Sequence, residues 1–133
     1  MKSANLDIVH EFLQAISQGK SGDELKDFYD EDVIQTEFPN LLTRKTIKRN
    51  LNDILDASIR GKQVISSQNY EIIKSYAVDD FVIIEAIWTG ILAVPVGKLA
   101  AGDKMKAYFS QIFEFKNGKI IAQKNYDCFE DFV

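Results

Sequence analysis

The sequence has 133 residues, of which 46% are hydrophobic and 27% are charged, and its net charge is −4. This composition is typical of a soluble globular protein and argues against disorder. The acidic balance disfavours nucleic acid or an anionic membrane surface as the main partner. We therefore expect residues 1–133 to form a single domain with a hydrophobic core of its own.

Three helices are predicted in the first half of the chain. Apolar residues recur at helical spacing over residues 5–18. Ser21 and Glu24 have the spacing of a capping box, which predicts a short second helix. Thr43 can cap a third helix over residues 44–60. Apolar and polar residues alternate in one short stretch before the third helix, and again from residue 67 onward.

Alternation with a period of two predicts strands at residues 33–38, 68–78 and 81–93, and a final hairpin around Asn117-Gly118. Asn-Gly accepts the positive φ angles of a type I′ turn, which fixes the hairpin register. In that register Gln111 faces Lys124, Phe109 faces Tyr126, and the polar side chains of Gln123, Asn125 and Asp127 point away from the core. Helices followed by consecutive strands indicate an α+β fold, a curved antiparallel sheet with helices on one face.

The strand at residues 81–93 is apolar on both faces. Val82, Ile84, Ala86, Trp88 and Leu92 alternate with Phe81, Ile83, Ile87 and Ile91. Helices can cover only one face, and large exposed apolar patches usually mark interfaces. We therefore expect a homodimer through the outer face of the sheet. The alternative is that the sheet curls and covers this face itself.

Four segments in this order resemble the nuclear-transport-factor-2-like superfamily, and within it the SnoaL-like and ketosteroid-isomerase-like branch. They read HEFLQAISQGKSGDELKDFYDEDV, QTEFPN, AIWTGILAVPVG and FEFKNGKIIAQKNYDCF. The resemblance covers nearly the whole chain. It implies a cone, in which a strongly curved antiparallel sheet is wrapped on its concave face by the three helices, with a pocket at the open end.

The best-known chemistry of this branch is proton transfer next to a carbonyl group. Ketosteroid isomerases use an aspartate as the base, with a tyrosine and a protonated aspartic acid as hydrogen-bond donors. By resemblance, the base falls on Phe38, the tyrosine on Phe12 and the protonated acid on Gln111. A phenylalanine can neither accept nor donate a proton, so steroid isomerisation by this mechanism is disfavoured.

Glu37 is the carboxylate nearest to the expected position of the base. A bulge in the strand would turn Glu37 into the pocket, where burial would make it a general base. Regular alternation would instead point it outward to pair with a cation. The expected ligand-binding residues are Phe12, Thr36, Phe38, Trp88, Phe109, Gln111, Lys124 and Tyr126. Gln111 and Lys124 either hydrogen-bond a ligand or are satisfied at the pocket rim, by backbone and by water.

One histidine, His10, and one cysteine, Cys128, make a soft-metal site improbable and exclude an internal disulfide. The N-terminal residues lack the apolar block of a signal peptide, and a cytoplasmic location is expected. The expected function is binding of a small apolar or polycyclic molecule in a mostly apolar pocket. The chain would then be a ligand-binding protein or a cofactor-free isomerase, cyclase or hydrolase. The alternative is a non-catalytic protein–protein interaction module of the same fold.

Overall fold

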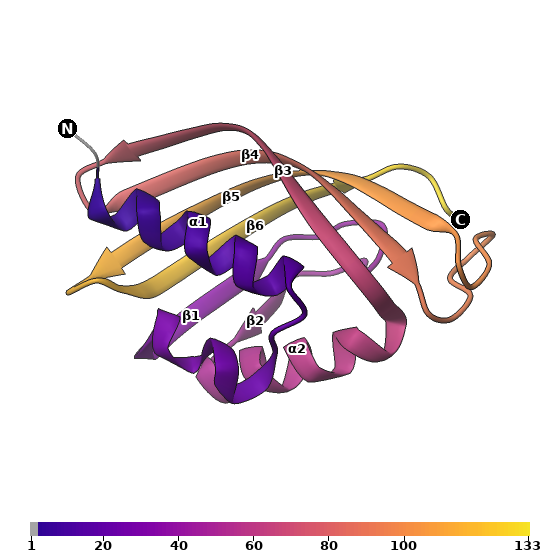
Figure 1. Cartoon of the computed structure of the whole chain (residues 1–133), viewed down its shortest axis with the longest axis horizontal. Helices are drawn as coiled ribbons and strands as arrows, with labels where there is room; N and C mark the ends of the chain where they lie inside the picture. The colour runs from indigo at the N-terminus through magenta and orange to yellow at the C-terminus, as the bar shows by residue number, and fades with distance from the viewer. Residues whose placement is uncertain (1–2) are drawn as a thin grey trace.

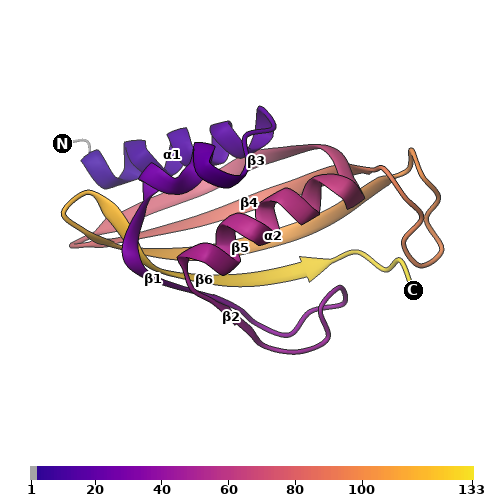
Figure 2. The ribbon, with the colours of Figure 1, turned by 90° about the horizontal axis from the view of Figure 1, so that it is seen from below.

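The computed structural model describes residues 3–133. Its helices are α1 (Ala4–Ser17), the 3-10 helix η1 (Gly22–Phe28) and α2 (Leu51–Val64). Its strands are β1 (Tyr29–Glu37), β2 (Ile47–Arg49), β3 (Ile65–Val78), β4 (Phe81–Leu92), β5 (Lys104–Lys116) and β6 (Lys119–Phe129). The strands form one sheet in the order β2-β1-β6-β5-β4-β3. In Figures 1 and 2 the long strands bend around one side, and α1 and α2 both lie on that concave side.

The α+β fold predicted from the sequence is confirmed, with two differences in the sheet. Four of the neighbouring strand pairs are antiparallel, but β1 and β6 run parallel. The short strand β2 adds a sixth strand at the edge beside β1. As a result β1 lies between β2, the next strand in the chain, and β6, the last one.

The predicted third helix is wrong at both ends, because α2 begins at Leu51 and ends at Val64. The cap is Asn50, whose side-chain oxygen accepts a hydrogen bond of 2.9 Å from the backbone N–H of Asp53. The Asp53 carboxylate in turn accepts from the backbone N–H of Asn50. An acidic first turn suits the helix dipole, whereas the basic residues at positions 44–49 would oppose it. Those residues form the loop before β2 and β2 itself.

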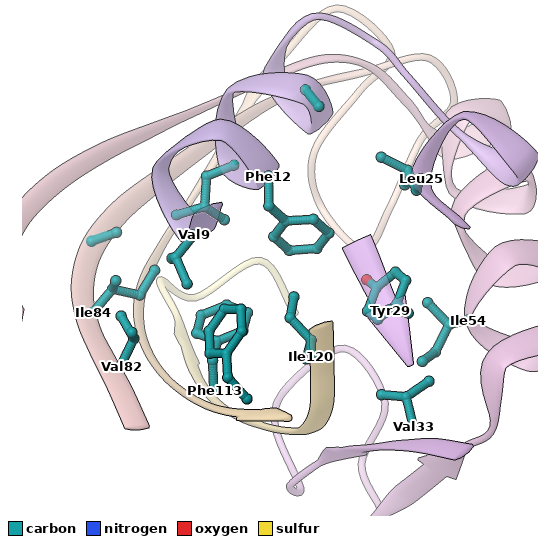
Figure 3. Packing of buried hydrophobic residues seen from close by; sticks show 14 of the residues in the cluster. Val9, Phe12, Leu25, Tyr29, Val33, Ile54, Val82, Ile84, Phe113 and Ile120 are labelled. Carbon is teal, nitrogen blue, oxygen red and sulfur yellow. The ribbon is translucent and has the colours of Figure 1, made fainter. Parts of the chain in front are cut away.

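The main hydrophobic core lies between α1, η1, α2 and the sheet (Figure 3). Phe12 of α1 is at its centre and is 2% exposed. Its ring makes edge-on contacts with Phe28 at 5.3 Å, Tyr29 at 5.6 Å and Phe113 at 6.0 Å between centroids. Such aromatic pairs add stability beyond the apolar area that they bury. These contacts join α1 to η1, β1 and β5.

The final hairpin turns at Asn117-Gly118, as predicted, with φ angles of 50° and 76°. Next to the turn, Phe115 pairs with Ile120, as the two-residue loop requires. The next pair is Glu114 with Ala122, so Ile121 is the extra residue of a β-bulge in β6.

Beyond this bulge the predicted register of the hairpin is wrong by one residue. Gln111 lies opposite Asn125 and not Lys124, and Phe109 lies opposite Asp127 and not Tyr126. A shift of one residue moves every later side chain of a strand to the other face of the sheet. The polar set that was expected outside therefore lies on the concave face.

Candidate functional site

A cavity of about 610 Å³ lies between the helices and the concave face of the sheet. Part of its wall is aromatic and aliphatic, and includes Phe12, Leu25, Tyr29, Ile54, Tyr70, Trp88, Met105, Phe109 and Phe129. Another part is polar, and consists of Gln35, Glu37, Arg49, Gln68, Gln111, Gln123, Asn125 and Asp127. The mostly apolar pocket expected from the sequence therefore has a polar wall, contributed mainly by β1, β2 and β6.

Flat aromatic side chains form the apolar part of the wall. The rings of Trp88 and Phe109 stack with centroids 5.5 Å apart and planes 17° apart, and Tyr70 lies 5.9 Å from Phe109. The indole N–H of Trp88 donates to the Gln68 side chain at 2.9 Å. Gly90 leaves room for this indole, because a Cβ atom at Gly90 would lie 2.5 Å from the Trp88 ring. This surface suits the flat apolar body of an organic molecule.

Glu37 lines the cavity and pairs with a cation at the same time. Its carboxylate oxygen Oε1 lies 2.9 Å from Nη1 of Arg49, and its Oε2 accepts a 3.0 Å hydrogen bond from Asn40. The same Arg49 nitrogen donates to the Gln35 side chain at 3.2 Å. Regular alternation in β1 thus points Glu37 into the cavity, and the expectation that alternation would point it outward is wrong. No bulge before Pro39 is needed.

Side-chain amides continue this polar wall from β1 to β6. The Gln35 amide donates to Gln123 at 3.3 Å, and the Gln123 amide donates to Asn125 at 3.0 Å. Both β6 residues are buried. Since a buried polar group is costly unless it is hydrogen-bonded, this chain of partners stabilises a polar surface inside the protein.

Asp127 is the next inward residue of β6, and it differs from Glu37 because it lacks a partner. Burial raises the pKa of Asp127 to about 7; the charge of Glu37 also raises it, and the charge of Arg49 lowers it. Among the described residues, the buried Oδ1 atom of Asp127 and the buried Oε1 atom of Gln111 have no hydrogen-bond partner. Asp127 can therefore exchange a proton near neutral pH and keeps one oxygen free for a ligand.

Tyr70 of β3 completes the surroundings of this carboxyl group. Burial raises the pKa of Tyr70 above its usual range, the charge of Asp127 raises it further, and a hydrogen bond with Gln111 partly opposes the shift. Tyr70 therefore stays a neutral phenol that can donate a hydrogen bond. An otherwise aromatic part of the cavity thus contains one polar site, formed by Asp127, Gln111 and Tyr70.

The structure brings together five of the residues expected from the sequence and leaves four outside the cavity. Phe12, Glu37, Trp88, Phe109 and Gln111 line the cavity. Thr36, Phe38, Lys124 and Tyr126 do not.

The four residues outside the cavity are neighbours on the other face of β1 and β6. Thr36 lies opposite Lys124 across the strand pair, and Phe38 stacks on Tyr126 at 4.7 Å between ring centroids. Lys124 is exposed, and Tyr126 is 42% exposed. Sequence reasoning missed Arg49, Gln123, Asn125 and Asp127; the one available signal was that three polar residues alternate in β6.

Within residues 3–133, no group of three or more His, Cys, Asp or Glu side chains is placed to hold a metal ion. None of the helices in the same range is long and apolar enough to cross a membrane.

The fold is shared with many solved structures of low sequence identity. IdmH from Streptomyces antibioticus, provisionally described as a polyketide cyclase, matches with a TM-score of 0.76 and 11% identity, covering 92% of this chain and 91% of that chain. A protein from Acidithiobacillus ferrooxidans with the same provisional description matches with a TM-score of 0.75 and 15% identity, over 96% and 89% of the chains. A protein with a ketosteroid isomerase-like fold from Catenulispora acidiphila, in complex with trimethylamine, matches with a TM-score of 0.69 and 18% identity, over 90% and 84%.

No family model and no curated protein matches the chain. The structural likeness shows that this chain has the nuclear-transport-factor-2-like, ketosteroid-isomerase-like fold, with neighbours that include SnoaL-like proteins. The resemblance proposed from the sequence is thereby confirmed for the fold. The same fold carries many different activities, so the function has to be argued from the cavity.

Proposed function

We propose that this chain binds a small organic molecule in the cavity and acts on it as a cyclase- or isomerase-type enzyme, by acid–base chemistry without a bound cofactor. The observation that carries the proposal is Asp127, a carboxyl group in the cavity wall with a pKa of about 7 and one unpartnered oxygen. General bases work best when their pKa is near the operating pH. The provisional description of two structural neighbours as polyketide cyclases supports the same class of chemistry.

Asp127 is the better candidate for the base than Glu37, which was the candidate from the sequence. Both carboxylate oxygens of Glu37 already have partners, because Arg49 pairs with one and Asn40 donates to the other. Asp127 lacks both restraints. We assign Asp127 the proton transfer, Gln111 and Tyr70 the orientation of the reacting group, and Glu37 the positioning of Arg49.

The experiment begins with the ligand. Native mass spectrometry of the protein purified from its own host, followed by denaturing extraction, identifies a molecule held in the cavity and gives a scaffold for turnover assays. Asp127→Asn is then expected to lower kcat by about 100-fold or more while the ligand still binds. The control is Asp79→Asn, which removes the same negative charge at an exposed position in the β3–β4 turn. Full turnover by Asp127→Asn would remove the assignment.

The same experiment tests the non-catalytic alternatives. Tight binding without turnover of any scaffold analogue would make the chain a ligand-binding protein. A cavity that takes up nothing would favour the interaction module, with the outer face of the sheet as its binding surface. A cytoplasmic location stays a prediction that fractionation of the host can check.

We also propose that two copies pair through the outer face of the sheet. Support comes from exposed aromatic residues on several strands of this face: Tyr76, Phe81, Tyr108 and Tyr126 are 51%, 42%, 45% and 42% exposed. Ile83 and Ile87 lie between them and are only partly buried. Light scattering is expected to give twice the chain mass at micromolar concentration, and Ile87→Lys is expected to give the monomer. A wild-type monomer would contradict this proposal.

A further inference from the structure

The charged residues of the cavity wall do not follow the charge of the protein. The whole chain has 20 acidic and 16 basic residues. The Lys, Arg, Asp and Glu side chains that line the cavity are four basic residues, Lys20, Arg49, Arg60 and Lys62, against two acidic ones, Glu37 and Asp127. The cavity wall is therefore more basic than the protein as a whole.

Three of these cations lie where the cavity meets solvent. Arg49 is taken up by the ion pair with Glu37. Lys20 follows α1, while Arg60 and Lys62 lie in the last turns of α2, and all three are exposed. Nζ of Lys62 donates to the backbone carbonyl of Gly19 at 2.8 Å, which joins the ends of the two helices at this place. We call Lys20, Arg60 and Lys62 the basic rim.

The rim also has free space beside it. A Cβ atom added to Gly19 or to Gly61 would meet nothing within 4 Å, and both glycines line the cavity. A helix C-terminus favours a nearby cation, which accounts for a basic residue at the end of α2. It does not account for Lys20, which follows α1 and lies at the same opening.

We propose that the ligand of this cavity is an organic anion, a carboxylate or a phosphate ester, whose anionic group lies at the basic rim and whose apolar body packs on Trp88 and Phe109. The inference rests on the proposed function only in taking this cavity as the ligand site. A cluster of cations at the opening attracts anions from solution and raises their local concentration. The uncharged form of Asp127, which is available near neutral pH, would not repel such a ligand.

Two fluorescent probes with the same body test the charge. 1-Anilinonaphthalene-8-sulfonate is an anion, and N-phenyl-1-naphthylamine is its neutral counterpart. The wild-type protein is expected to bind the sulfonate more tightly than the amine, and added salt should weaken only the sulfonate. Changing the rim residues together to Gln (K20Q, R60Q and K62Q) should weaken the sulfonate by about tenfold and leave the amine within about twofold.

Three further variants make the result specific. K104Q, K116Q and K124Q together make the same change in net charge at exposed positions of β5 and β6 outside the cavity wall, and should not alter either affinity. Gly61→Phe places a large side chain in the free space at the rim and should weaken both probes, whereas Gly61→Ala should weaken neither.

The outcomes separate this inference from the proposed function. If Gly61→Phe weakens both probes but the rim variant leaves the sulfonate unchanged, the cavity binds ligands and the anion inference is overturned. If Gly61→Phe affects neither probe, the probes bind elsewhere and the cavity itself fails as a ligand site. If both triple variants weaken the sulfonate equally, the effect is one of net charge, and the rim has no special role.

Discussion

The two halves of the curved sheet present different faces to the interior. In β4 the inward residues are apolar without exception, from Val82 and Ile84 near its start to Leu92 at its end. In β1 and β6 the inward residues become polar along the strands, with Glu37 in β1 and Gln123, Asn125 and Asp127 in β6. The inward side of β4 thus belongs to the core and, at Trp88, to the aromatic wall of the cavity, whereas the later inward residues of β1 and β6 form its polar wall.

A single inserted residue creates much of this difference. Before Ile121, β6 contributes the fully buried Ile120 to the core, and after it β6 contributes Gln123, Asn125 and Asp127 to the cavity. Without the bulge, Lys124 and Tyr126 would face inward. The comparison shows how a strand can serve the core at one end and a polar site at the other without a change in its overall path.

The largest expected effect is on the apolar side of the comparison. Phe113 is fully buried and contacts Phe12, so Phe113→Ala is expected to lower the free energy of unfolding by about 3–5 kcal/mol. Asn125→Ala in the polar wall removes one hydrogen-bond partner of Gln123 and is expected to cost about 1–2 kcal/mol. Urea unfolding measures both, and an equal cost would show that the two halves do not differ in this way.

The next effect is the pH dependence of stability that Asp127 should cause. Its carboxyl group has a pKa of about 7 in the folded protein and the usual 3.8 in the unfolded chain, so the folded state binds more protons between these values. The free energy of unfolding should therefore fall as the pH rises from about 4 to about 7, by roughly 2–4 kcal/mol, and should level off above that. Asp127→Asn should lack this decline in a comparison of unfolding curves.

The wild type and the Asn variant need to be compared over the same pH range, because other carboxylates titrate there too. Asp79→Asn keeps those groups and is the control. If the free energy of unfolding depended on pH in the same way for the wild type and for Asp127→Asn, the burial of Asp127 in the cavity wall would be contradicted.

The charges of Glu37 on β1 and Arg49 on β2, which form an ion pair, should each shift the pKa of Asp127. Arg49→Gln leaves the Glu37 carboxylate without its cation and is expected to cost about 1–3 kcal/mol. It should also raise the pKa of Asp127, because the charge of Arg49 lowers it, whereas Glu37→Gln should lower that pKa. NMR titration of both variants measures these opposite shifts. Shifts in the same direction would show that the pair does not act through its charges.

The smallest effect concerns the outer face and uses the single cysteine. Cys128 follows Asp127 and is exposed on the outer face, opposite Tyr108 of β5. A thiol reagent should label it in the native protein, fast at high dilution and more slowly at concentrations where two copies pair. Cys128→Ser should change stability by less than about 0.5 kcal/mol. A thiol that reacts only after unfolding, at every concentration, would place Cys128 inside and contradict the bulge.

The sequence predicted the architecture because periodicity and turn chemistry are local. The Asn117-Gly118 turn, the inward set of β4 and the position of α1 all follow from spacing alone. The third helix failed because its true cap, Asn50 with Asp53, lies six residues inside the predicted helix.

Much of the polar wall could not be predicted, because a bulge has no strong sequence signal. Ile120, Ile121 and Ala122 are three apolar residues in a row, and the sequence alone does not indicate that one of them is extra. The orientation of Glu37 depended on which face of β1 the helices cover, which is a tertiary fact. Trp88 and Phe109 were correctly expected in the cavity because β4 and β5 keep the register that alternation implies.

The central claim is that the bulge turns Asp127 into the cavity, where it can take part in acid–base chemistry at neutral pH. The most direct test is a carbon-13 NMR titration of the side-chain carboxyl groups, with the Asp127 signal assigned by its loss in Asp127→Asn. We expect a pKa of about 7 for this group. A value near 4 would mean that Asp127 is solvated, and would contradict both its place in the wall and its role as the base.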